Sequence, residues 1–237
     1  MVSLASRMSL ALVLAVAPNQ ASSLADAQVR AAEFDFAGAA TLLKAAAERG
    51  DTSAQVAAIY IRGLIDAREA SRQGGSPESL APVHDAVASL ERIAKGRPGP
   101  AEIARLMLRA AAAAAQSERE EMRLYLETAI RMETLQRAAG MPGAPLVAAG
   151  ETAGDLWLQV HRYDEARRAY DEAAERQGSS LRILAGRARA ARGLDDTPAA
   201  CSASRALLAA WGARTGDPAE LGDARAYVAG SCEGSAR

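Results

Sequence analysis

The sequence predicts an all-α protein, an α-solenoid of about five antiparallel helical hairpins followed by a C-terminal capping helix. Aromatic residues make up only 4% of the 237 residues. The core is therefore built from aliphatic side chains, and alanine-rich interiors suit helices whose backbones approach closely. Small and apolar residues also recur at intervals of three, four and three, which places them on one helix face. Segments with this spacing start at Phe36, Val83 and Tyr163.

Composition and charge restrict the class of function. The chain is 49% apolar and 24% charged, which is ordinary for a protein that buries a sizeable core. Its formal net charge of −1 provides no long-range field to attract nucleic acid. The composition therefore predicts no nucleic-acid partner, and it leaves the oligomeric state open.

The N-terminus has the layout of a secretory signal peptide. Arg7 precedes an apolar run over residues 8–17, which is followed by polar and then small residues. The run is shorter than the roughly 20 apolar residues that cross a bilayer, so no stable membrane span is expected. We expect a signal peptide over residues 1–25, cleavage after Ala25 or Ser23, and a periplasmic or secreted protein. The alternatives are an uncleaved anchor or a wrongly assigned start codon.

Residues 26–139 are predicted to form irregular helical repeats. Asp51 or Thr52 can cap a helix that continues past Gly63, and Ser76 caps the next helix with Pro77 in its first turn. A run rich in glycine and proline then ends that helix. The alanine-rich stretch that follows is predicted to be a packed helix and not a linker, because alanine is the best helix former. Further helices are expected over residues 26–34, 36–46, 101–115 and 118–138.

A glycine- and proline-rich linker at residues 140–146 separates these repeats from more regular ones at residues 147–230. Three small or apolar positions recur 34 residues apart in this second part, which indicates a repeat. Asp217 and Pro218 then start a last helix, the expected cap, before a tail at residues 231–237. The recurring pairs are Ala166 and Ala200, Tyr170 and Ser204, and Ala173 and Leu207.

Two segments resemble known repeat families. The order Gly150, Ala153, Gly154, Trp157, Ala166 and Tyr170 resembles one tetratricopeptide repeat. Residues 44–63 resemble the junction between Sel-one-like repeats. The resemblance implies stacked hairpins whose first helices line a concave groove for a peptide or a partner helix. It implies a non-enzymatic scaffold or adaptor with a protein or peptide as partner, and the predicted signal peptide places this protein in the bacterial cell envelope. An accessory or regulatory subunit with one fixed partner is the alternative.

The resemblance also indicates which side chains face the groove. The arginines among them have no acidic neighbour in the sequence, so they suit a carboxylate such as a peptide C-terminus. The alternative is a solvated, arginine-rich face that is partly neutralised by the acidic residues of the preceding unit. The expected groove residues are Glu151, Asp155, Gln159, Arg182, Arg189 and Arg192.

The sequence contains no pattern that indicates catalysis, a metal site or a cofactor. His84 and His161 are far apart and lack the spacing of metal ligands. Residues 230–234 have the spacing of a nucleophile elbow, but no predicted strand precedes them. We therefore predict no catalytic residue, no metal ligand and no cofactor.

Cys201 and Cys232 are the two cysteines. An even number of cysteines in an exported protein suggests a disulfide. A bond between them would close a loop of 31 residues and attach the capping helix to the array. The alternative is a pair of free thiols in a cytoplasmic protein.

Overall fold

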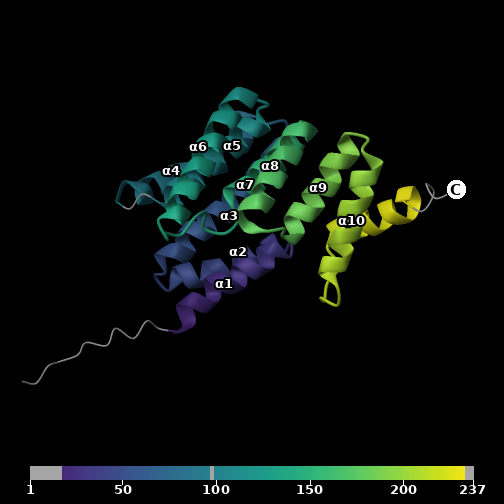
Figure 1. The fold of residues 1–237 in the computed structure, drawn as a ribbon. Helices are drawn as coiled ribbons and strands as arrows, with labels where there is room; N and C mark the ends of the chain where they lie inside the picture. The colour runs from purple at the N-terminus through teal and green to yellow at the C-terminus, as the bar shows by residue number, and fades with distance from the viewer. Residues whose placement is uncertain (1–17, 97–98, 233–237) are drawn as a thin grey trace, which may run out of the picture.

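The computed structural model describes residues 18–96 and 99–232, and each regular element in this part of the chain is helical (Figure 1). Most of the predicted signal peptide and the end of the predicted tail lie outside the described residues. The helices are α1 (Pro18–Ala32), α2 (Phe36–Glu48), α3 (Thr52–Arg72), α4 (Pro77–Gly96), α5 (Pro100–Ala115), α6 (Arg119–Ala138), α7 (Ala149–Gln159), α8 (Tyr163–Gln177), α9 (Leu181–Gly193), α10 (Thr197–Trp211), α11 (Ala219–Tyr227) and the short π-helix η1 (Val228–Cys232).

The helices stack as five hairpins and a final helix. Consecutive helices pair as α1–α2, α3–α4, α5–α6, α7–α8 and α9–α10, and α11 packs on α10. Both helices of each hairpin contact the first helix of the next hairpin. This double contact is what makes a helical array continuous. The all-α, solenoid-like fold with five hairpins and a capping helix is therefore confirmed.

The same turn closes four of the five hairpins. Its central residue has a positive φ, between 55° and 68°, although it is never glycine. The next residue donates its backbone N–H to a carbonyl five positions earlier, as in a Schellman cap. Because glycine is absent, the sequence does not reveal this repeated feature. The central residues are Phe34, Ser117, His161 and Asp195.

Ser117→Gly should raise the free energy of unfolding by about 0.5–1 kcal/mol, because glycine adopts a positive φ without the steric cost of a Cβ. Ser117 is exposed with a φ of 62°, so the change removes little else. Urea denaturation measures the difference. The matched control is Ser202→Gly on an exposed, interior position of α10. There the same change should destabilise, and a gain at both positions would contradict the explanation.

The alanine-rich helix α5 lies at the centre of the array. It contacts α3, α4, α6 and α7, and its six consecutive alanines from Ala110 to Ala115 are all buried. The small side chains allow helices to approach on several sides at once. This stretch is a packed helix, as predicted.

Residues 140–146 connect α6 to α7 without helical structure. Glu133 fixes this connection, because its carboxylate accepts hydrogen bonds from the backbone N–H groups of Ala144, at 3.0 Å, and Ala149, at 2.8 Å. Val147 then packs in a cluster with α1, α2 and α3. The predicted linker is therefore held at both ends by contacts with the array.

The position predicted for signal cleavage, after Ala25, lies inside α1. Leu24 packs beside the cluster formed by α1, α2 and α3, and the Ser23 hydroxyl accepts a hydrogen bond from Arg49 at 3.3 Å. Ala27 and Ala31 of α1 are fully buried and lie beyond the cleavage position. Cleavage would therefore shorten α1 but retain these two buried residues.

Cys201 on α10 and Cys232 at the end of η1 form a disulfide, with their sulfur atoms 2.04 Å apart. This is the predicted pairing, and it joins the capping segment to the last hairpin. The central residue of the nucleophile-elbow pattern is Cys232, so that position carries no free thiol.

Titration of the unfolded, unreduced protein should find no reactive thiol. Cys201→Ala combined with Cys232→Ala should lower the free energy of unfolding by about 2–3 kcal/mol, because the unfolded chain regains the freedom of a 31-residue loop. Two reactive thiols before reduction would refute the bridge.

Candidate functional site

Three of the predicted groove residues meet in a buried ion-pair cluster between α7 and α9. Arg182 lies 3.3 Å from Glu151, measured from Nε to Oε2, and also pairs with Asp155. The residue is only 8% exposed. The expectation that this arginine has no acidic neighbour is therefore wrong. It is also not part of a solvated face, because two carboxylates neutralise it inside the protein.

Uncharged groups complete this cluster. The Tyr170 hydroxyl donates to Asp155 at 2.6 Å, and the Gln177 amide donates to Glu151 at 3.1 Å. The Phe36 ring lies 4.7 Å from the guanidinium carbon of Arg182, which is within the range of a cation–π contact. We refer to Glu151, Asp155, Arg182, Tyr170 and Phe36 as the Arg182 cluster.

Burial determines the electrostatics of the Arg182 cluster. Burial raises the pKa of Glu151, and the charge of Arg182 opposes that rise. Burial also raises the pKa of the Tyr170 hydroxyl well above its usual value, and the charge of Asp155 adds to the effect. These groups are costly to bury unless they remain paired. Separating these pairs inside the protein would therefore be strongly destabilising.

The other predicted groove residues do not join this cluster. Arg189 is exposed on α9, one heptad after Arg182. Arg192 lies over the Tyr227 ring of α11 at 5.2 Å, so it contributes to packing of the cap. Gln159 is partly buried, and its Nε2 has no hydrogen-bond partner within the described residues. Arg189 is therefore the predicted residue best placed to meet a ligand.

A cleft of about 730 Å³ lies between the first hairpin and the loop that joins α10 to α11. Volumes of roughly 300–1,000 Å³ are typical of ligand pockets. The cleft combines apolar and aromatic side chains with four carboxylates and one arginine. Its lining residues are Asp26, Val29, Arg30, Glu33, Phe34, Asp35, Leu42, Trp211, Thr215, Gly216, Asp217 and Pro218.

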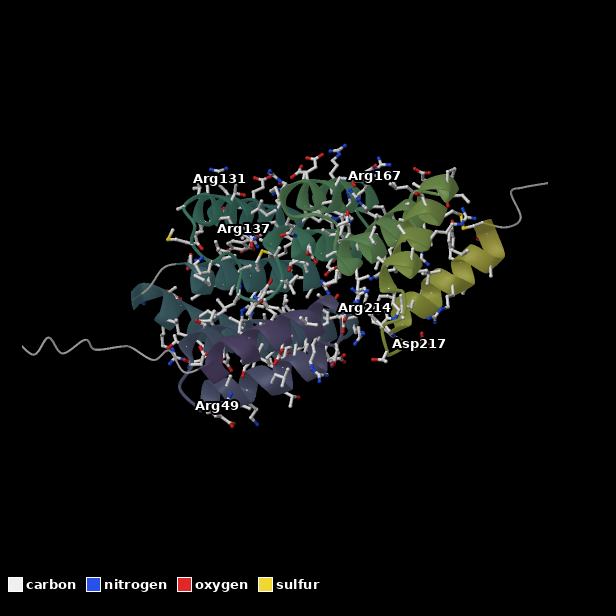
Figure 2. All side chains as sticks on the ribbon, turned by 60° about the horizontal axis from the view of Figure 1, so that its bottom comes forward. Arg49, Arg131, Arg137, Arg167, Arg214 and Asp217 are labelled. Atoms are coloured by element: carbon white, nitrogen blue, oxygen red, sulfur yellow. A yellow bond between two sulfur atoms is a disulfide. The ribbon has the colours of Figure 1, made fainter. Side chains whose placement is uncertain are left out.

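Ion pairs organise the rim of this cleft. Arg30 bonds Asp35 at 2.7 Å, and Arg214 reaches Glu33 at 3.4 Å. The pKa of Asp35 is lowered by the backbone N–H of Gly38 and by Arg30. In Figure 2, Arg214 lies where the purple first hairpin meets the yellow C-terminal unit. The cleft thus combines charged side chains, several of them in ion pairs, with apolar ones.

Sequence reasoning missed this cleft because its two sides belong to the first and last units of the chain. No spacing within one unit brings Phe34 and Trp211 together. The positive φ of Phe34 was not visible either, since phenylalanine is an uncommon residue for that conformation. The cleft is a product of how the stacked hairpins curve.

The two histidines are not part of a site of this kind. His84 is exposed on α4, and His161 lies in the turn between α7 and α8, where its Nδ1 is 3.0 Å from the Tyr163 hydroxyl. Over residues 18–96 and 99–232, no three metal-binding side chains gather into a candidate site. In the same part of the chain, no helix is long and apolar enough to cross a membrane.

Comparison of the chain with protein-family models, with curated protein sequences and with solved structures finds no match.

Proposed function

We propose that this protein is a non-enzymatic scaffold or adaptor of the tetratricopeptide type, which binds a peptide or a helix of a partner protein. The cleft between the first and last units carries this proposal. It has the size of a binding pocket, and its lining combines the aromatic side chains of Phe34 and Trp211 with charged side chains. Aromatic side chains supply large contact areas at low entropic cost, which is why protein-binding sites are rich in them.

The proposed location is the cell envelope or the exterior. Support comes from the signal-like N-terminus and from the Cys201–Cys232 disulfide, since disulfides persist in oxidising compartments. N-terminal sequencing of protein from the envelope fraction tests this proposal. A mature chain that starts near Asp26 would support export, and an intact Met1 would contradict it.

Affinity purification of the full chain from the envelope fraction, followed by mass spectrometry, tests the binding function. Val29→Glu is the cleft variant, because Val29 lines the cleft and is 56% exposed, so that the fold should tolerate the change. Partners of the cleft should be reduced about tenfold or more by this variant, since a charge then replaces apolar contact area. Arg189→Glu tests the carboxylate hypothesis separately, and partner binding unchanged by it would remove that hypothesis.

The alternative function is an accessory or regulatory subunit with one fixed partner. Leu124 and Leu135 favour it, because they lie on the same face of α6 and are 60% and 64% exposed. Leu124→Lys combined with Leu135→Lys is the matched variant for this face. A partner lost with this variant but retained by Val29→Glu would favour the accessory subunit over the cleft-binding adaptor.

A further inference from the structure

Side chains from one turn connect the first hairpin to the last two helical units. Phe36 lies against Arg182 of α9 at 4.7 Å. Glu33 pairs with Arg214, which follows α10, at 3.4 Å. Phe34 packs against a buried cluster formed by Ala185, Leu207, Trp211, Leu221 and Ala224. We call Glu33, Phe34 and Phe36 the latch.

The latch joins surfaces that otherwise touch little. Helices α1 and α2 pack on each other and on α3, whereas no extended packing joins either of them to α9, α10 or α11. Figure 1 shows the α1–α2 hairpin running toward the lower end of α9. The closure of the array therefore depends on a small number of side-chain contacts. Regions joined in this way open at lower free energy than packed cores.

The latch covers Arg182, one of the residues that the resemblance assigned to a ligand-binding groove. Phe36 lies on the guanidinium group of Arg182, so it shields the ion pairs of that residue with Glu151 and Asp155. Glu33 and Phe34 also line the cleft. The chain thus places the Phe36 ring over Arg182 and the Glu33 carboxylate beside Arg214. A ligand that carries an aromatic ring and a carboxylate could make the same two contacts.

We propose that the latch is an intramolecular occupant of a binding surface formed by Arg182, Arg214 and the cluster around Trp211, and that a partner segment with the same chemistry displaces it. Such a segment carries an acidic residue next to an aromatic one. Its aromatic ring would replace Phe36 on Arg182, and its carboxylate would replace Glu33 at Arg214. The identity of the partner rests on the proposed function, whereas the closure of the array by the latch does not.

Hydrogen exchange on the full chain tests the closure. In Phe34→Ala combined with Phe36→Ala, the hydrogen-bonded amides of Ile183 and Leu184 in α9 and of Gly212 and Arg214 after α10 should exchange about tenfold faster or more, with α5 and α6 unchanged. Val29→Ala, which trims the same hairpin outside the latch, should leave these rates unchanged. Unchanged rates in the double variant, or a uniform increase over the whole array, would overturn the proposal.

A second pair of variants covers the case in which the double variant fails to fold. Arg214→Glu repels Glu33 and should accelerate exchange of the hydrogen-bonded amides at positions 212 and 214. Glu33→Arg added to Arg214→Glu restores an ion pair and should slow exchange again. If exchange remains fast in the variant with the two charges swapped, the Glu33–Arg214 ion pair has no role in closure.

A synthetic peptide of residues 30–37 is the probe for the partner chemistry. It should bind the double phenylalanine variant about tenfold or more tightly than the wild type, because the wild-type latch competes at high effective concentration. The same peptide with both phenylalanines replaced by alanine should not bind. Equal binding to both proteins, or no binding to the open variant, would refute displacement. If the peptide binds but affinity purification finds no partner protein, the latch proposal stands and the scaffold function is rejected.

Discussion

Replacement of Arg182 by methionine should lower the free energy of unfolding by about 3–5 kcal/mol at pH 7, because it leaves a buried carboxylate without its partner. Arg182 is 8% exposed, and Glu151 is also buried. Methionine keeps much of the side-chain volume, so the loss reports on charge more than on a cavity. Urea denaturation of the full chain measures the change.

The loss should shrink as the pH falls. Burial raises the pKa of Glu151 above the ordinary value of 4.5, while Arg182 opposes that rise. The folded state then binds the proton more tightly than the unfolded state does. Stability therefore falls as the pH rises above 4.5 toward the folded pKa. Without Arg182 the pKa of Glu151 rises further, so the variant should recover stability between pH 7 and pH 5 relative to the wild type.

Two further variants separate charge from packing. Arg189→Met removes an exposed arginine of the same helix and should change the free energy of unfolding by no more than about 0.5 kcal/mol. Glu151→Gln added to Arg182→Met should restore at least about half of the loss, since the uncompensated charge is gone. A pH-independent loss with no recovery in the double variant would mean that Arg182 acts mainly through packing.

Gly186→Val should destabilise the protein by about 4 kcal/mol or more, and Gly186→Ala by about 3 kcal/mol, because no space exists for a Cβ. A Cβ at Gly186 would lie 2.1 Å from Cζ of the Tyr170 ring. The ring is also close to α7, since a Cβ at Gly154 would lie 2.5 Å from its Cε1 and Cζ atoms. The ring is thus clamped between α7 and α9, and its hydroxyl is fixed on Asp155.

Thermal and urea denaturation measure this effect, with Gly222→Ala as the control. No atom lies within 4 Å of a Cβ built at Gly222, a position inside α11. There alanine should stabilise by about 0.5–1 kcal/mol through helix propensity. Tyr170→Leu in the Gly186→Ala background should be non-additive and recover part of the loss. Fully additive losses would place the strain elsewhere than at the Tyr170 ring.

Sequence reasoning located part of the candidate site but described it as an accessible groove, whereas it is a buried ion-pair cluster. The spacing of Glu151 and Asp155 placed both on one side of α7, and Arg182 was expected on the comparable side of the next first helix. The structure brings these three together. Partial neutralisation of the arginines by these acids was the alternative interpretation, but the burial of the pair was missed because the acids belong to a different hairpin from the arginine. The distance between hairpins depends on small residues such as Gly154 and Gly186, whose effect appears only when helices pack.

The sequence by itself determined the helical nature of the chain, the order of five hairpins and a cap, and the only disulfide that its two cysteines could form with each other. These features depend on helix-breaking residues, caps and apolar spacing, which act over a few residues, or on a choice that two cysteines leave unambiguous. Only the tertiary structure decided the burial of Arg182, the latch and the cleft. These features depend on rotations between successive hairpins, which accumulate over five units and bring residues 33–36 to α9 and α10. A pattern within one hairpin does not determine the total rotation over five hairpins.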